Sequence, residues 1–469
     1  MSSPWEVFGC EEVDAAPAPQ EEPADVCGSA HPFFASRLLG ESSLDEAVAA
    51  LESSARALAA DCAASLRAAC HDQAAALLLS TVPEVDHQVE LFTMSTAMSA
   101  SAFCAHALAV LETSGWQLPA WGTAHALCRC RLAAHALAAS SPAQSLRHAD
   151  EALLAASRAS EDGSVGPQQL RRALGAVLHA ASAALPPLAP FSCVFSVLED
   201  IRSPHSLPGA PAAAPVPRAS YDATSLRTFL QRHVVPGQPL LLENCAAKWP
   251  ALSRWRDLGQ LCSRYGHRTL PVELSGGAQC AAHAAAPTAM QHMMLLELVQ
   301  RHLAPNIASG GASCDATLTA YVSQHGLLTQ LSGLSDDILV PRLASYTPLR
   351  ACNAWLGSAG TVTHLHTDEA HNILVQVCGT KLVRLYLPSE GLAHALRATP
   401  HPRAAPDALL NQFSEVHAEA PDARARAALQ AFPPPLEVLL SPGDALFIPK
   451  GCWHYVRSLT PALSVNFWW

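Results

Sequence analysis

Two different patterns of hydrophobic residues divide this chain. Between about Ser43 and Leu185, alanine and leucine recur at helical spacing, and glycine and proline are rare. Apolar residues three and four positions apart line one face of an α-helix, so this half is predicted to be all-helical. Ser43 to Glu46 has the form of a capping box that starts a helix. Further helices are expected at about 86–112, 122–139, 145–159 and 167–184.

After about residue 220 the pattern changes to short hydrophobic runs separated by turn residues. The runs are rich in valine, leucine, isoleucine and aromatic residues: QPLLLE, TLPVEL, NILVQVC, KLVRLYL, DALFIP and SVNFWW. Many short strands with turn signals favour a β-sandwich or jelly roll. The runs NILVQVC and KLVRLYL flank Gly379-Thr380, a Gly-X pair that predicts a two-residue hairpin turn of type II′.

These patterns predict an α+β multidomain chain. Residues 1–28 are acidic and rich in proline and alanine, so they are predicted to be disordered. Residues 29–202 form the predicted helical domain, and 203–219 form a proline-rich linker. Residues 220–469 form the predicted jelly-roll domain.

Composition narrows the classes of function. Half of the residues are hydrophobic, which is enough for sizeable cores, and the net charge of −11 argues against direct nucleic-acid binding. It does not exclude a protein substrate with a basic side chain. The sequence contains neither a secretory signal at its start nor an apolar run long enough for a membrane span. The 15 cysteines are scattered, with no CxxC pair, which favours a reduced intracellular protein of the nucleus and/or cytoplasm.

A candidate metal site stands within the β-rich half. In the segment Thr363 to Asp368, His366 and Asp368 are two residues apart, so on a strand they share one face. His454, in the run Trp-His-Tyr, is the candidate third ligand. Two histidines and one carboxylate leave the other positions of a metal open, an arrangement that suits Fe(II).

The His-x-Asp pattern alone is weak, because about one copy is expected by chance among 22 histidines. A second copy does occur, at His148 and Asp150, but in helical sequence. There, side chains two positions apart project about 200° apart and cannot share a metal. His364, one alternation before His366, is interpreted as structural.

Three separated blocks carry a resemblance. NAWLGSAGTVTHLHTD, NILVQVCGTKLVRLYLP and LSPGDALFIPKGCWHYVRSL resemble the JmjC (Jumonji-C) oxygenases, in particular those of the arginyl hydroxylase and lysine demethylase type. The likeness extends upstream through PGQPLLLENCAAKWPALSRW and RTLPVEL, so it covers about residues 225–469. It implies a double-stranded β-helix, or cupin, fold and an enzyme that uses Fe(II), the cosubstrate 2-oxoglutarate and O2.

The resemblance also implies roles for individual residues. His366, Asp368 and His454 would be the iron ligands. Lys381 would pair with the distal carboxylate of 2-oxoglutarate, although its position alone favours a solvated lysine at a strand end. The other residues implied to bind 2-oxoglutarate are Tyr321, Thr363 and Asn372.

For the substrate, the resemblance implies that Glu273 pairs with a guanidinium between Trp355 and Trp468. From the residues alone, the favoured interpretation is that both tryptophans are core residues and Glu273 is an exposed charge at a strand end. The leading hypothesis is hydroxylation of arginine side chains in proteins. The alternatives are a histone lysine demethylase and a catalytically weak interaction module whose helical domain binds partner proteins.

Overall fold

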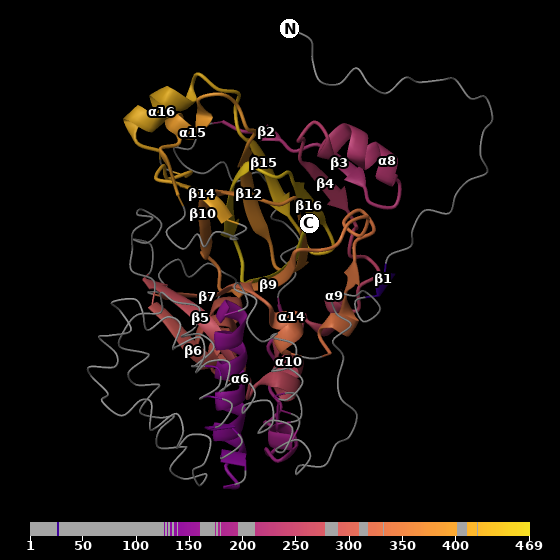
Figure 1. Cartoon of the computed structure of the whole chain (residues 1–469), viewed down its shortest axis with the longest axis vertical. Coiled ribbons are helices and arrows are strands. Elements are labelled where there is room, and N and C mark those ends of the chain that lie inside the picture. The colour runs from indigo at the N-terminus through magenta and orange to yellow at the C-terminus, as the bar shows by residue number, and fades with distance from the viewer. Residues whose placement is uncertain are drawn as a thin grey trace, which may run out of the picture.

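The computed structural model describes residues 26–27, 139–159, 180–195, 212–276, 289–308, 318–331, 333–400, 410–419 and 421–469, with a few positions between 126 and 178 (Figure 1). The predicted helix at 86–112 lies outside the described residues, as does most of the predicted disordered segment, helical domain and linker. These remain predictions.

One long helix of the N-terminal half is described. Helix α6, Pro142–Ala159, contains the helix predicted at 145–159. Its buried residues Leu146, Ala149 and Leu153 pack in a cluster with buried positions from 126–137 and 174–181. The described positions within the helices predicted at 122–139 and 167–184 are helical too, except for the turn residue at the end of each range.

Two sheets form the β-rich half within the described residues, as a jelly roll requires. In sheet order, the seven-stranded sheet contains β13 (Ala398–Pro400), β14 (Leu410–Ser414), β10 (Val362–Asp368), β17 (Trp453–Ser458), β12 (Lys381–Tyr386), β15 (Leu436–Leu440) and β2 (Ala214–Pro215). The nine-stranded sheet contains β3 (Arg218–Ser220), β4 (Leu240–Glu243), β16 (Ala445–Ile448), β11 (Asn372–Cys378), β18 (Ala462–Trp468), β9 (Ala351–Gly357), β7 (Leu318–His325), β5 (Thr269–Gly276) and β6 (Ala289–Met294). Each of the six predicted strands is present.

The remaining helical elements are short. They are α8 (Leu226–Phe229), the π-helical turn Leu230–Val234, α9 (Ala251–Arg254), α10 (Leu258–Tyr265), α12 (Leu295–Leu298), the π-helical turn Val299–Leu303, α13 (Ala304–Ala308), α14 (Leu327–Gln330), the 3-10 turn η4 (Ser335–Asp337), α15 (Leu392–Ala395) and α16 (Ala423–Leu429). Of these, α15 and α16 pack against the seven-stranded sheet.

The nine-stranded sheet is buried on both faces at its central strand β11. Along β11, Ile373 and Val375 belong to the large core on the helix side of the sheet. Leu374 belongs instead to a second core, which it shares with Val383 and Leu385 of the seven-stranded sheet. Successive side chains point to opposite faces of a strand, so a strand covered on both sides reads as a continuous hydrophobic run.

The predicted hairpin at Gly379-Thr380 is wrong. Strand β11 pairs with β16 and β18 of one sheet, whereas β12 pairs with β15 and β17 of the other. The chain therefore crosses between the sheets at this turn. Gly379 is required there because its φ is +72° and a Cβ would lie 2.0 Å from the carbonyl oxygen of Pro461.

The β-rich domain also begins earlier than predicted. Strand β2, Ala214–Pro215, pairs in parallel with β15, and β3, Arg218–Ser220, pairs in parallel with β4. Both strands lie at sheet edges, where a proline costs no ladder hydrogen bond. The end of the predicted linker is thus part of the sheets. Val26–Cys27, within the segment predicted to be disordered, forms β1 and pairs with β8 (Leu339–Val340).

Candidate metal centre and its surroundings

Three side chains from two neighbouring strands converge in the seven-stranded sheet. His366 and Asp368 lie on β10, and His454 lies on β17 directly opposite His366. The two imidazole rings are 4.1 Å apart between centroids. The Nε2 atom of His366 is 3.6 Å from Oδ1 of Asp368, and the Nε2 atom of His454 is 3.6 Å from Oδ2. This is the cluster of three potential metal ligands found within the described part of the chain.

The backbone of β10 is irregular around these residues. Its register shifts between Thr363 and His366 along β17, and between Thr367 and Asp368 along β14. Such bulges change the direction in which a side chain points. Simple alternation therefore predicts that His366 and Asp368 lie close together, but it does not predict these shifts in strand register.

Hydrogen bonds orient both imidazoles. The Nδ1 of His366 is 2.7 Å from the carbonyl oxygen of His364, and the Nδ1 of His454 is 3.0 Å from that of Cys452. A carbonyl oxygen only accepts, so each Nδ1 carries the proton and each Nε2 has the lone pair. Burial lowers the pKa of His454 to about 4, so this ring is neutral near pH 7. Neutral imidazoles held in this tautomer are suited to metal binding.

Asp368 is buried with one oxygen left open. Its Oδ2 accepts a hydrogen bond of 3.1 Å from Nε1 of Trp468, and Nδ2 of Asn372 lies 3.5 Å away. Its Oδ1 is buried and has no hydrogen-bond donor among the described residues. Burial raises the pKa of Asp368 to about 6, against the lowering effects of His366, Trp468 and Asn372.

This donor set fits a divalent cation. Metal bonds of about 2.1 Å that meet at about 90–120° separate ligand atoms by about 3.0–3.6 Å. The Nε2 of His366 lies 3.6 Å from Oδ1 of Asp368 and the Nε2 of His454 lies 3.6 Å from Oδ2, so each distance is at the upper end of that range. A buried carboxylate that faces two imidazoles, with no hydrogen bond to Oδ1 among the described residues, is unfavourable unless a cation neutralises it.

The site lies inside the sandwich, between the two sheets. The donors to Asp368 come from β18 and β11 of the nine-stranded sheet, while the three clustered residues come from the seven-stranded sheet. Sequence reasoning missed the bond from Trp468 to Asp368, because the two residues are 100 positions apart. The alternation in SVNFWW could have indicated that Asn466 and Trp468 share one face of the last strand.

Lys381 is a buried cation near the cluster. It begins β12 and is 1% exposed, so it is not the solvated strand-end lysine that its position alone allows. Its Nζ lies 5.7 Å from the centroid of the Tyr321 ring, and the Tyr321 hydroxyl is 3.5 Å from Oγ1 of Thr363. Burial lowers the pKa of Lys381 to about 7. The structure thus brings Lys381, Tyr321 and Thr363 together, and no described acidic side chain forms a salt bridge with the lysine.

Of the three predicted substrate residues, two lie around Tyr321. Glu273 lies on β5 directly opposite Tyr321, is half-buried and accepts a 2.6 Å hydrogen bond from the hydroxyl of Ser323. The Trp355 ring is 6.0 Å from the Tyr321 ring, and its Nε1 donates to Oδ1 of Asn466. Trp468 is buried on the metal side, where it donates to Asp368.

The other histidines singled out in the sequence lie outside the cluster. His364 contacts His417 edge to face, with ring centroids 6.2 Å apart. His148 and Asp150 lie on α6, and Asp150 pairs with Arg268 instead of with a histidine. Among the described residues, no helix is both long enough and apolar enough to cross a membrane.

Comparison with known proteins places this geometry in a family. Residues 226–469 match the model of the cupin-like domain. The chain is 35% identical over 252 residues to lysine-specific demethylase JMJ30 of Arabidopsis thaliana, covering 52% of this chain and 53% of that protein. It is 33% identical to Jumonji C domain-containing protein 5 of Drosophila melanogaster, covering 53% of this chain and 58% of that protein. It is 32% identical to lysine-specific demethylase 8 of Xenopus tropicalis, covering 52% and 51%.

The aligned region thus spans about half the length of each of these relatives. It coincides with the β-rich domain that holds the three converging side chains. More than half of the chain matches the family model, and one of these relatives is named for its Jumonji C domain. The chain therefore belongs to the cupin-like domain family, and its β-rich half is a JmjC domain.

Proposed function

We propose that this chain is an Fe(II)- and 2-oxoglutarate-dependent dioxygenase that acts on basic side chains of proteins. The observation that carries the proposal is the convergence of His366, Asp368 and His454 in the same sheet as the buried Lys381. When bound, the iron supplies the oxidising chemistry, using O2 and converting 2-oxoglutarate to succinate and CO2. The family membership and the names of the relatives support the same class of enzyme.

The residues of the chain have distinct tasks in this proposal. His366 and His454 offer their Nε2 lone pairs and Asp368 a carboxylate oxygen, so the protein occupies one side of the ion. Lys381 holds the distal carboxylate of 2-oxoglutarate, because a buried ammonium is stabilised by a carboxylate partner. Tyr321 and Thr363 lie beside it and offer hydroxyl groups, and Asn372 offers an amide. The surrounding core excludes water from the cosubstrate.

Arginine is the substrate side chain that we favour. The half-buried carboxylate of Glu273 suits a guanidinium, which forms two parallel hydrogen bonds with a carboxylate. The ring of Trp355 is suited to stacking on such a planar cation. Trp468 remains part of the proposed wall of this pocket, with its indole N–H already engaged by Asp368.

Lysine demethylation is the second candidate, and the names of two relatives favour it. A methylated ammonium has fewer N–H groups to offer to Glu273 than a guanidinium has. The two reactions therefore make different demands on this residue. Glu273→Gln is expected to impair a reaction on arginine strongly and a reaction on methylated lysine little.

Mass spectrometry of a peptide library distinguishes these outcomes. The full chain is loaded with Fe(II) and 2-oxoglutarate without oxygen, and air is then admitted in the presence of arginine and methylated-lysine peptides. A gain of one oxygen on arginine supports hydroxylation, whereas loss of a methyl group from lysine supports demethylation. Asp368→Ala is the inactive control. If the wild-type chain neither binds Fe(II) nor modifies any peptide, the proposal is wrong.

A further inference from the structure

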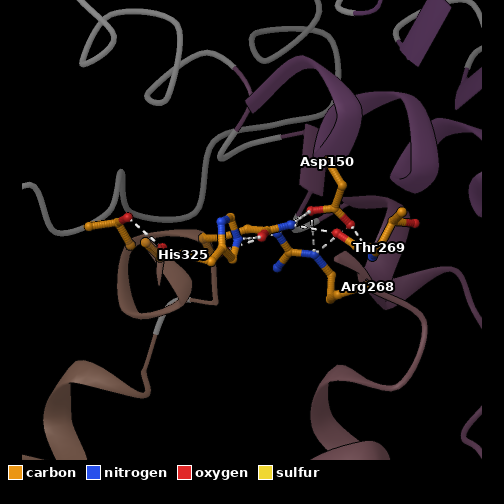
Figure 2. Close-up of polar contacts among 7 residues, drawn as sticks. Asp150, Arg268, Thr269 and His325 are labelled. Carbon is orange, nitrogen blue, oxygen red and sulfur yellow. Dashed lines mark hydrogen bonds and ion pairs between the residues drawn. The ribbon is translucent and has the colours of Figure 1, made fainter. Parts of the chain in front are cut away.

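A buried aspartate of α6 reaches into the JmjC domain. Helix α6 packs against β5, and Figure 1 shows it beside β5 and β6. The carboxylate of Asp150 is fully buried there and accepts hydrogen bonds from Nε and Nη2 of Arg268 at 3.0 and 2.7 Å. It also accepts from the backbone N–H of Thr269 and from Nε2 of Gln330, both at 2.8 Å (Figure 2). Its hydrogen-bonding capacity is filled by the protein itself.

These bonds replace the backbone hydrogen bonds that β7 does not make to the start of β5. On one side, β5 pairs with β6 from Thr269 onward, but on the other side its pairing with β7 begins only at Glu273. On the side of α6, Asp150 accepts the N–H of Thr269, and Gln330 donates to the carbonyl of Thr269. Buried backbone groups need such partners. Two side chains thus hold the end of a strand where the ladder is absent.

The backbone of β7 explains why that ladder stops. Its register along β9 shifts between Val322 and His325, and Gln324 has a φ of +44°. The chain then turns into α14, Leu327–Gln330. The His325 ring lies 2.5 Å from Oε1 of Gln330, so the network of Asp150 extends from α6 to the end of β7.

From this network β5 leads directly to the proposed substrate residue. Glu273 lies four positions along β5 from Thr269 and is paired with Tyr321 and bonded to Ser323, both of β7. The candidate metal ligands lie on β10 and β17, in the other sheet. A displacement of β5 therefore moves Glu273 and leaves the strands of the metal centre in place.

A second acid strengthens the attachment of α6. Glu151 is buried and forms ion pairs with Arg129 at 2.7 Å and Arg147 at 3.2 Å, and His292 of β6 lies 3.8 Å away. Burial raises the pKa of Glu151, but hydrogen bonds from His148 and His292 and the charge of Arg129 outweigh it and hold this pKa well below its usual range. One face of α6 is thus apolar and packs on helical neighbours, while an acid pair faces β5 and β6.

We propose that Asp150 is a positioning residue that ties α6 to β5 and thereby sets the place of Glu273 on the substrate side of the site. Helix α6 lies outside residues 226–469, which match the family model, so it extends the catalytic domain beyond that match. The part of this inference that concerns the substrate rests on the proposed function.

Hydrogen exchange of the full chain tests the attachment without any turnover. Asp150→Asn is compared with Asp337→Asn, because Asp337 is also buried and accepts bonds from Arg254 and from Nε1 of Trp255. Asp150→Asn is expected to speed exchange of the β5 amides by at least about tenfold more than exchange of the β10 and β17 amides. Asp337→Asn should not speed exchange of β5 beyond that of β10 and β17. Unchanged exchange in β5, or an equal rise in all strands, would overturn the inference.

Steady-state kinetics tests the consequence for the substrate. With a peptide that carries one central arginine, Asp150→Asn is expected to raise KM by about tenfold. Its kcat and its Kd for 2-oxoglutarate should stay within about twofold of wild type, as should all three values for Asp337→Asn. A fall in kcat with unchanged KM would contradict a role on the substrate side. If the wild type modifies no peptide, the proposed function fails, while the exchange of β5 still decides whether Asp150 positions the strand.

A second variant covers the case in which Asp150→Asn does not fold. The double change Asp150→Leu with Arg268→Met replaces the buried ion pair by apolar side chains, which buried sites often tolerate. It still removes the acceptor for the N–H of Thr269. It is therefore expected to give the same rise in β5 exchange and in KM. A normal β5 in this variant would refute the positioning role.

Discussion

Two buried aspartates in this protein stand in the same local sequence pattern and have opposite surroundings. Asp150 follows His148 on a helix, and Asp368 follows His366 on a strand. Both are at most 2% exposed. Asp150 is surrounded by donors: a guanidinium, a backbone N–H and an amide. Asp368 faces two imidazole lone pairs and keeps one oxygen without a hydrogen bond within the described residues.

The difference shows how to separate a structural carboxylate from a ligand. Asp150 is satisfied by the protein, so it joins segments of the fold. Asp368 is incomplete without a cation, and burial of its charge is unfavourable until one binds. Secondary structure produces the distinction, because only a strand places side chains two positions apart on one face. The predictions below test this contrast.

The largest expected effect is on metal binding. Asp368→Ala removes the only carboxylate among the three clustered residues, so affinity for Mn(II), measured by calorimetry without oxygen, should fall by more than about 100-fold. His364→Ala is the control, because His366 bonds to the backbone carbonyl of residue 364 and not to its side chain. If Asp368→Ala bound Mn(II) like wild type, the assignment of the metal centre would fail.

The stability of the metal-free protein should change in opposite directions for the two aspartates. Asp150→Asn leaves the guanidinium of Arg268 buried without its counter-charge, so the free energy of unfolding should fall by about 3–5 kcal/mol. Asp368→Asn should raise it by roughly 1–3 kcal/mol at pH 7, because burial raises the pKa of Asp368 from 3.8 to about 6 and its charge opposes folding.

Urea unfolding in the presence of EDTA measures both effects. The stabilisation expected for Asp368→Asn also depends on pH, because an acid whose pKa is raised by folding binds protons more tightly in the folded state. Wild-type protein without metal should therefore gain stability from this group as pH falls through 6, and Asp368→Asn should not. Equal destabilisation by both substitutions would abolish the contrast between the two sites.

Much of the β-rich half could be predicted from the sequence, because its strands are short hydrophobic runs between turns. The convergence of His366, Asp368 and His454 could be predicted as well, since two of these residues depend on the period of one strand. The hairpin at Gly379-Thr380 could not be predicted correctly. A Gly-X turn shows where the chain reverses, but distant strands decide whether the flanking strands pair with each other or join different sheets.

The burial of Asp150 had no local signal. Its partner Arg268 is 118 residues away, and an acid on a helix is usually a solvated charge. Burial of Lys381 likewise involves Tyr321 of the other sheet. Residues whose placement follows from local periodicity were therefore predictable, whereas residues whose placement follows from long-range packing were not.

A smaller effect is expected from the donor that orients Asp368. Trp468→Phe removes the N–H that holds Oδ2 and should weaken Mn(II) binding by about 10–100-fold, because groups that orient ligands tune metal affinity to this degree. Trp355→Phe is the matched control, since its indole N–H bonds to Asn466 instead. Equal metal affinities in the two variants would show that the bond to Asp368 has no effect on the metal site.

The last effect is gradual, depends on pH and extends the contrast to a buried cation. Like Asp368, Lys381 is buried without an oppositely charged partner among the described residues, and burial lowers its pKa to about 7. In the proposed function the ammonium form pairs with 2-oxoglutarate, so binding takes up a proton above this pH. Affinity for 2-oxoglutarate in the Mn(II)-loaded protein should therefore fall by up to about tenfold per pH unit between pH 7 and 9. Lys381→Met should bind 2-oxoglutarate weakly at pH 7 and show no such slope, because it has no amine to protonate. If the Kd of the wild type stays constant from pH 7 to 9, protonation of Lys381 is not linked to binding of 2-oxoglutarate. The proposed pairing of its ammonium form with the cosubstrate would then be wrong.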